Sequence, residues 1–171
     1  MIPILKYLVP AIISLSFSLS LQPGLQPAVQ SEQSGETYLV TKVVDGDTFW
    51  IDDGTPRGQK IRLIGVDAPE TQNSRTRKKG EMGEEVKDYL TSLILNKKVR
   101  LEYDAGRYDR YRRTLAYVYL EDGTFINNHL LEKGYAVLMT YPPNIKHIDL
   151  FKETQTRARE ASKGLWGKEI E

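Results

Sequence analysis

Two short acidic clusters could supply ligands for a metal ion. Residues 45–48 read Asp-Gly-Asp-Thr, and residues 67–70 read Asp-Ala-Pro-Glu. Each lies at the edge of a segment with strand composition, so that side chains from both clusters can converge on one site. Carboxylate oxygens are hard ligands that suit calcium or magnesium. Short acidic loops with glycine or proline are also common as solvated turns, so these clusters alone leave both interpretations open.

Arginines accompany the carboxylates. Arg62 precedes the second acidic cluster, and residues 107–114 read Arg-Tyr-Asp-Arg-Tyr-Arg-Arg-Thr. A guanidinium group can bind phosphate oxygens through two parallel hydrogen bonds, although a run of like charges is by itself typical of a solvated turn. Together, metal ligands and arginines indicate chemistry on a phosphodiester, because negative charge accumulates on the phosphorus during attack by water.

Composition places these residues in one folded domain and excludes several other chemistries. The chain has 171 residues, of which 40% are hydrophobic and 27% charged, close to the averages of globular domains. It has 24 Lys and Arg against 23 Asp and Glu, so attraction to a polyanion must come from the local arrangement of charge. Cysteine is absent and histidine occurs twice, which excludes disulfides and thiolate sites and argues against a histidine-rich zinc site.

The first segment is predicted to direct export. Lys6 precedes an uncharged, largely apolar stretch over residues 7–21, which is shorter than the roughly 20 apolar residues of a spanning helix. Ser18 and Ser20 form an imperfect cleavage pattern, so we interpret residues 1–21 as a signal peptide of a secreted or periplasmic protein. An uncleaved membrane anchor and a buried N-terminal helix are the alternatives. Residues 22–35 have the composition of a flexible linker, and residues 36–171 are expected to form the domain.

The pattern of the domain predicts a small barrel. β-Branched and alternating apolar residues predict strands over residues 38–44, 48–52, 60–66, 99–103 and 115–120. The alternation in the third segment points Arg62 away from the core. Strands cluster early and show no βαβ regularity, so we expect an α+β fold, a five-stranded barrel of the OB type with about three helices.

The helices are expected in the second half of the chain. An apolar stripe over residues 86–94 predicts a packing helix. Asn127 is expected to cap a short helix that ends at Gly134, and residues 147–163 predict a terminal helix. The basic segment 71–80 is expected to be a loop, either guiding a polyanion to the site or simply mobile on the surface.

Three motifs, taken together, resemble the staphylococcal nuclease (thermonuclease) family. They are Val-Asp-Gly-Asp-Thr at 44–48, Arg-Leu-Ile-Gly-Val-Asp-Ala-Pro-Glu at 62–70 and Asp-Arg-Tyr-Arg-Arg-Thr-Leu-Ala-Tyr at 109–117. The similarity covers residues 36–166, with matching order and spacing. It implies a calcium-dependent nuclease whose substrates are DNA and RNA, with a preference for single strands and products that end in 3′-phosphate. The resemblance implies no stable protein partner, so a monomer is expected.

The same resemblance assigns roles to individual residues. It implies the calcium ligands Asp47, Asp67 and the backbone carbonyl of Ala68, and the catalytic residues Arg62, Glu70 and Arg113. The arginines would hold the scissile phosphate, and Glu70 would take a proton from the attacking water. A noncatalytic nucleic-acid-binding or scaffold domain is the alternative function, and the presence of all these residues argues against it.

Further positions carry second-tier assignments and departures from the family. Tyr111 and Tyr141 match aromatic positions near the terminal nucleotide, where stacking tolerates any base, although both could pack against the barrel. Thr48 matches a position beside the metal or simply begins a strand. Ala68 stands where the family has threonine. In the same comparison Arg112 replaces a common glycine, which would strain a turn that needs positive φ, and Met139 replaces a tyrosine of one relative.

Overall fold

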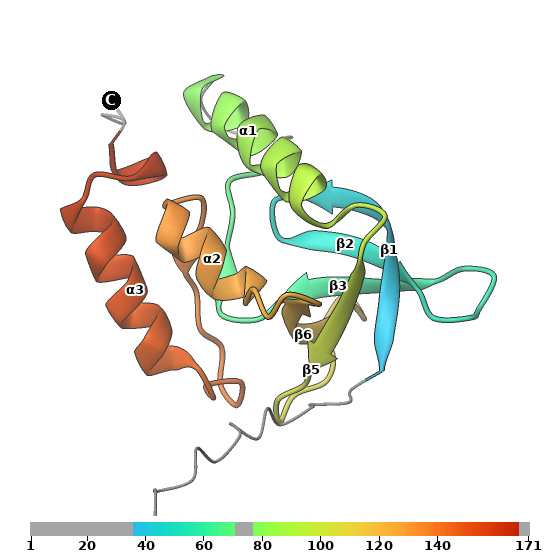
Figure 1. Ribbon diagram of the computed structural model, residues 1–171. Helices are drawn as coiled ribbons and strands as arrows, with labels where there is room; N and C mark the ends of the chain where they lie inside the picture. The colour runs from blue at the N-terminus through green and yellow to red at the C-terminus, as the bar shows by residue number, and fades with distance from the viewer. Residues whose placement is uncertain (1–35, 71–76, 168–171) are drawn as a thin grey trace, which may run out of the picture. The chain divides into compact units, whose positions relative to one another are not determined.

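Five antiparallel and parallel strands close into a barrel in the computed structural model, which describes residues 36–70 and 77–167 (Figure 1). The strands are β1 (Thr37–Asp45), β2 (Thr48–Asp52), β3 (Gln59–Leu63), β5 (Lys98–Glu102) and β6 (Thr114–Leu120). Their order around the barrel is β1-β2-β3-β6-β5. The predicted α+β fold with a five-stranded OB-type barrel is confirmed. The predicted signal peptide 1–21 and linker 22–35 lie outside the described residues.

Alternation along the strands fills the barrel with apolar side chains. Val40, Phe49, Ile51 and Ile61 are fully buried, and the residues between them on the same strands face outward. Only the β3–β6 pair is parallel. Between these two strands in the sequence lie β4, α1 (Arg77–Ile94) and β5. Arg62 lies in β3 between buried Ile61 and Leu63, so it points out of the core as predicted.

The strand predicted over residues 60–66 is divided in the structure. β3 ends at Leu63, and the two-residue strand β4 (Val66–Asp67) pairs instead with β7 (Val137–Leu138). Gly65 lies between them with φ of 78°, a conformation that favours glycine. A Cβ there would lie 2.6 Å from the ring of Phe151. The prediction of a continuous strand was therefore wrong, because packing of a distant helix turns the chain at this glycine.

Three helices accompany the barrel in the described part of the chain, as predicted. They are α1, α2 (Ile126–Lys133) and α3 (Ile148–Glu160), followed by a short 3₁₀ helix (Gly164–Trp166). In Figure 1, α2 and α3 lie side by side, and α1 lies across the end of β1. The segment 71–80 was predicted to be a loop, but α1 already begins at Arg77; residues 71–76 lie outside the described residues. No helix in the described part of the chain is long and apolar enough to cross a membrane.

Asn127 is not a helix cap, contrary to prediction. The N-cap of α2 is Phe125, and Asn127 is fully buried inside the first turn. Its Oδ1 accepts a hydrogen bond from Val118 N at 2.9 Å, and its Nδ2 donates to Ile64 O at 2.9 Å and to Ala116 O at 3.3 Å. The amide therefore ties α2 to β6 and to the segment that follows β3. Gly134 ends the helix with φ of 71°, as expected.

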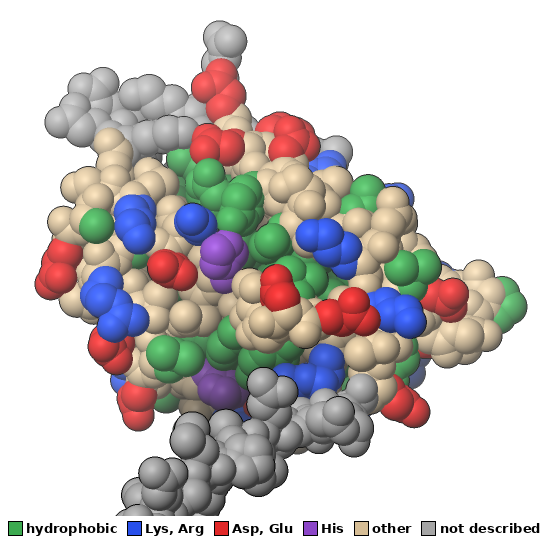
Figure 2. All heavy atoms as spheres, viewed as in Figure 1, with side chains coloured by type: hydrophobic (Ala, Val, Ile, Leu, Met, Phe, Trp, Pro, Cys, Tyr) green, Lys and Arg blue, Asp and Glu red, His purple; other side chains and the backbone are tan. Residues whose placement is uncertain are grey.

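Charge is mixed on the one face of the molecule that Figure 2 shows. On this face, acidic and basic side chains lie interspersed rather than gathered by sign. This agrees with the formal net charge of +1. Any binding of a polyanion must therefore depend on local groups.

Candidate active site

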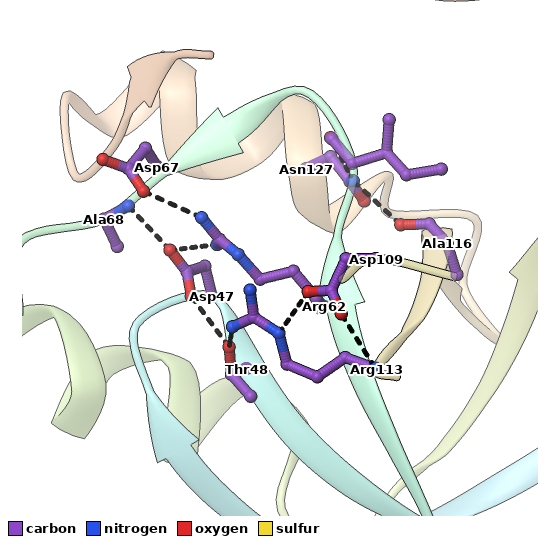
Figure 3. A network of polar contacts seen from close by, with 10 residues as sticks. Asp47, Thr48, Arg62, Asp67, Ala68, Asp109, Arg113, Ala116 and Asn127 are labelled. Carbon is purple, nitrogen blue, oxygen red and sulfur yellow. Dashed lines mark hydrogen bonds and ion pairs between the residues drawn. The ribbon is translucent and has the colours of Figure 1, made fainter. Parts of the chain in front are cut away.

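The two acidic clusters meet at one arginine. Asp47 lies in the turn between β1 and β2, and Asp67 ends β4. The guanidinium of Arg62 on β3 lies between them: Nη1 forms an ion pair with Asp47 Oδ2, and Nη2 donates to Asp67 Oδ1 at 2.8 Å (Figure 3). Both carboxylates therefore face the same small volume.

Asp47 is buried and rigidly held. Its side chain is only 9% exposed. Its Oδ2 accepts a hydrogen bond from Ala68 N at 2.9 Å, and its Oδ1 accepts one from Thr48 Oγ1 at 3.0 Å. Burial raises the pKa of Asp47, while Arg62 and the hydrogen bond from Ala68 oppose that rise. A carboxylate in this position requires positive charge nearby to remain ionised.

Close packing places the first cluster against the second. A Cβ on Gly46 would lie 2.6 Å from Val86 Cγ1 and 2.7 Å from Ala68 Cβ. Any larger residue would push the turn away from Ala68, whose N–H binds Asp47. Gly46 therefore allows the close approach that joins the two acidic clusters.

The second arginine reaches the site from another loop. Arg113 immediately precedes β6, and its Nη1 lies 3.4 Å from Thr48 Oγ1, next to Asp47. Its Nε donates to Asp109 Oδ2 at 2.6 Å, and its backbone N–H donates to Asp109 Oδ1 at 2.9 Å. Figure 3 shows the guanidinium turned toward Thr48, on the same side as Arg62. The two guanidiniums can therefore act on one ligand.

Asp109 is a site residue to which sequence reasoning assigned no role. Besides holding Arg113 it accepts a hydrogen bond from Tyr111 N at 2.8 Å. Burial alone would raise the pKa of Asp109, but hydrogen bonds from Arg113 outweigh that effect and lower it. An aspartate four residues before the arginine was the available signal, because such spacing closes a short loop on its own side chain.

The loop that carries Arg113 is a tight hairpin with a left-handed residue. Arg112 N donates to Asp109 O at 3.0 Å, Asp109 N donates to Arg113 O at 3.1 Å, and Tyr108 bridges Thr114. Arg112 has φ of 62°, the position that such turns commonly give to glycine. The departure from the family pattern thus does place a side chain at positive φ.

The remaining predicted site residues, Glu70, Tyr111 and Tyr141, are exposed. Glu70 is exposed, and no ion pair joins it to a described residue of the site. Tyr111 and Tyr141 are 64% and 71% exposed, so neither packs against the barrel, and the Tyr111 ring lies 5.5 Å from Arg113 Cζ. The Arg110 guanidinium lies over the Tyr111 ring, 4.7 Å from its centroid. The roles assigned to these residues stay predictions.

Asn144 is a second residue that sequence reasoning did not assign to the site. It is buried, accepts a hydrogen bond from Gly106 N at 2.6 Å and donates one to Gly106 O at 2.9 Å. These bonds join the segment that follows Tyr141 to the segment that leads into the Arg113 hairpin. A lone asparagine in a loop gave no signal of this contact, because its partner lies 38 residues away.

The donor set fits a hard divalent cation. Asp47 and Asp67 offer carboxylate oxygens to one volume, and Asp109 adds a third negative charge beside Arg113, whereas only two guanidiniums oppose them. That balance would repel a phosphodiester, and a divalent cation would reverse its sign. No group of three or more His, Cys, Asp or Glu side chains within residues 36–70 and 77–167 forms a complete cage. Water and substrate oxygens would therefore have to complete the coordination, as they often do for hard cations.

Fold and site together define an OB-fold domain with a carboxylate and arginine centre for a phosphorylated ligand. The family model "Staphylococcal nuclease homologue" matches residues 60–168. The chain is 39% identical to the thermonuclease of Staphylococcus intermedius over 157 residues, covering 91% of each protein. It is 41% identical to the thermonuclease of Staphylococcus hyicus over 137 residues, which is 80% of this chain and 79% of that protein.

A less similar relative is named an endonuclease. The chain is 35% identical over 131 residues to the endonuclease YncB of Bacillus subtilis, covering 74% of this chain and 60% of that protein. The family model begins at residue 60, after β1 and β2, whereas the match to the thermonuclease of Staphylococcus intermedius covers 91% of the chain. The chain belongs to the staphylococcal nuclease family.

Proposed function

We propose that this protein is a calcium-dependent nuclease that hydrolyses DNA and RNA, prefers unpaired strands and leaves 3′-phosphate ends. As a member of the staphylococcal nuclease family, with relatives named thermonuclease and endonuclease, it is a nuclease that hydrolyses phosphodiester bonds. The observation that carries the finer proposal is the convergence of Asp47 and Asp67 on Arg62, with Arg113 beside them.

The two arginines would bind the scissile phosphate. Arg62 already forms ion pairs with both aspartates, and Arg113 is fixed by Asp109 with its Nη1 near Thr48. A phosphodiester becomes more negative as water attacks the phosphorus, so prepositioned guanidiniums stabilise the transition state more than the ground state. Calcium, held by Asp47, Asp67 and the Ala68 carbonyl, would supply additional positive charge beside that phosphate.

Glu70 would act as the general base. Glu70 is exposed and follows Asp67 by three positions, on the segment that begins with β4. It would accept the proton as the water oxygen bonds to phosphorus and the bond from phosphorus to the 5′ oxygen breaks. That bond cleavage leaves the phosphate on the 3′ end. General-base catalysis of this kind contributes roughly 100- to 10,000-fold.

The preference for unpaired strands rests on two exposed tyrosines. Tyr111 and Tyr141 expose most of their surface, and the site residues are carboxylates and arginines suited to phosphate rather than to base edges. Stacking on tyrosine requires a base that has left a duplex but tolerates any base. Comparing initial rates on duplex and denatured DNA of one sequence tests this preference. Mapping of end-labelled products tests the 3′-phosphate.

The central test combines metal dependence with one substitution. Denatured DNA is incubated with the protein in calcium or in a chelator, and Glu70→Gln is compared with the parent and with Glu121→Gln, an exposed turn glutamate. We expect calcium-dependent cleavage that falls roughly 100-fold or more in Glu70→Gln and is unchanged in Glu121→Gln. Cleavage that survives the chelator would reject calcium. Equal rates for Glu70→Gln and the parent would reject the base.

Export is also part of the proposal, and it rests on the apolar stretch over residues 7–21. N-terminal sequencing of protein recovered from the medium or the periplasm tests it. A new N-terminus after about residue 21 supports a cleaved signal peptide. Recovery only with membranes, with Met1 intact, would support the anchor instead.

A further inference from the structure

The outer face of the barrel that carries the site continues into an aromatic and basic row. Thr48 on β2 pairs with Arg62 on β3. Because side chains two positions apart on a strand share a face, the next outward pair is Trp50 and Lys60, which are also direct partners. On β1, Lys42 pairs with Trp50 from the other side. Lys42, Trp50 and Lys60 are called the Trp50 row below.

Trp50 is a tryptophan on the outside of a barrel. It is half-buried, and the Nζ of Lys60 lies 5.9 Å from its ring centroid. Its neighbours along β2, Phe49 and Ile51, are fully buried and supply the apolar contacts of this strand. Packing of the barrel therefore does not require the Trp50 indole on the opposite face.

The lysines on either side of Trp50 are available to a ligand. Lys42 is exposed and Lys60 is half-buried, and neither forms an ion pair with a residue of the described chain. Their register places Lys42 and Lys60 on the strands on either side of Trp50, and the Lys60 ammonium lies over the indole ring. This arrangement of an aromatic platform between cations is what single-stranded nucleic-acid sites use, since bases stack while phosphates meet lysine or arginine.

The Trp50 row is continuous with the site. Diagonal neighbours on adjacent strands lie about 7–8 Å apart, so Trp50 is within that range of Arg62 across the β2–β3 pair. In Figure 1, β1, β2 and β3 lie side by side, and residues 53–58 then project from the barrel. The row ends at Asp52, which pairs with Leu39. A carboxylate there repels phosphate, so the platform has room for a short stretch of strand only.

We propose that the Trp50 row is a second nucleotide subsite, where a base of an unpaired strand stacks on Trp50 while Lys42 and Lys60 contact its neighbouring phosphates. The inference rests on the proposed nuclease function and extends it. The strand held at Arg62 and Arg113 continues along the outer face of β2 rather than leaving into solvent. The subsite adds affinity for a base without reading its identity.

A binding experiment without cleavage tests this subsite. The parent, Trp50→Leu and Trp50→Phe are titrated in chelator with a labelled oligothymidylate of about 12 nucleotides and with an abasic oligomer of equal length, and anisotropy gives each Kd. We expect Trp50→Leu to raise the Kd of the oligothymidylate on the order of 10-fold and to leave the Kd of the abasic oligomer within about twofold. Trp50→Phe keeps a ring and should restore most of the affinity. Equal weakening toward both oligomers would show a structural role and overturn the proposal.

Matched lysine variants distinguish specific phosphate contacts of the Trp50 row from a general effect of removing one positive charge. Lys42→Ala and Lys60→Ala are compared with Lys98→Ala, an exposed lysine on β5. The first two should weaken binding of both oligomers and each lower the salt dependence of Kd by about one phosphate contact. Lys98→Ala should not. The same effect in all three variants would contradict the proposed contacts.

Tryptophan fluorescence tests the subsite without any substitution of Trp50. The chain has two tryptophans, so Trp166→Phe leaves Trp50 as the only one. Oligothymidylate should quench its emission with the Kd found by anisotropy. Binding that leaves Trp50 emission unchanged would overturn the proposed subsite but would not contradict the proposed nuclease function. No binding together with no cleavage would instead reject the proposed function.

Discussion

Asp109 fixes both the backbone and the guanidinium of Arg113. One oxygen accepts the N–H groups of Tyr111 and Arg113, and the other accepts Arg113 Nε at 2.6 Å. A single carboxylate therefore sets the loop and aims the arginine at Thr48. In a site built from prepositioned charges, the orientation of a guanidinium is as necessary as its presence.

Replacing Asp109 should misplace Arg113. Asp109→Asn offers one oxygen in place of two, so either the loop or Nε loses its acceptor. We expect kcat/KM to fall roughly 100-fold. The same change in an Arg113→Ala background should add little, because the aspartate acts through the arginine. Asp122→Asn, in an exposed turn where Asp122 accepts Thr124 N, is the control. Fully additive losses in the double variant would show that Asp109 has a separate role.

Lysine should not replace Arg113. The arginine uses Nε on Asp109 and keeps Nη1 for the site, whereas a lysine has a single nitrogen for both tasks. Arg113→Lys should lose most activity, on the order of 100-fold in kcat, with substrate binding less affected. Arg112→Lys is the neighbouring control and should be nearly silent. If Arg112→Lys proves the damaging change, the wrong arginine has been assigned to the phosphate.

Glycine at position 112 should stabilise the protein. Arg112 has φ of 62°, and a left-handed conformation costs a residue with a Cβ about 1 kcal/mol. Arg112→Gly should therefore raise the melting temperature by about 2–4 °C. Arg110→Gly, in the same loop but without positive φ, should give no gain. A lower melting temperature for Arg112→Gly would mean that the Arg112 side chain contributes more than its backbone costs.

Loss of the Asn127 amide should destabilise the fold. Its three hydrogen bonds join α2 to Val118, Ile64 and Ala116 in a fully buried position. Asn127→Ala removes all three of these hydrogen bonds, although Ala116 O keeps one from Ile64 N, and should cost about 3 kcal/mol in the free energy of unfolding, measured by urea denaturation. Asn128→Ala is the adjacent control, because the buried Oδ1 of Asn128 accepts no hydrogen bond within the described chain. Similar losses in both variants would argue against the network.

Acid should weaken the contribution of Asp104 to the stability of the fold. Burial alone would raise the pKa of Asp104, but hydrogen bonds from the N–H groups of Lys146 and Ala105 and from the Tyr117 hydroxyl lower it. A folded pKa below the unfolded value gives stability that is present above about pH 4 and is lost as pH falls through the folded pKa.

The measurement compares Asp104→Asn with the parent across pH. We expect the variant to be less stable at neutral pH by about 1–2 kcal/mol, and the difference to shrink below about pH 4. Asp149→Asn changes an aspartate whose side chain is 96% exposed and should show neither effect. A difference that is constant from neutral to acid pH would contradict the lowered pKa.

By itself the sequence determined the local structure of this protein. Alternation in the strand predicted over residues 60–66 placed Arg62 outside the core, because successive side chains of a strand face opposite sides. The three motifs with their spacing indicated the nuclease family, and Gly134 ended a helix where its position predicted. These features depend on neighbours a few residues apart, which is the range over which chain geometry acts directly.

Only the tertiary structure decided which distant groups meet. Asp47 accepts a hydrogen bond from Ala68, 21 positions along the chain, and Arg113 contacts Thr48, 65 positions away. Closure of the barrel and the parallel β3–β6 pair bring these residues together. The turn at Gly65 and the buried amide of Asn127 were mispredicted for the same reason, since their partners Phe151 and Ile64 lie far along the chain. Likewise, Trp50 gained neighbouring lysines only through the register of three strands. Packing and register between distant segments are properties of the whole fold, which no local pattern contains.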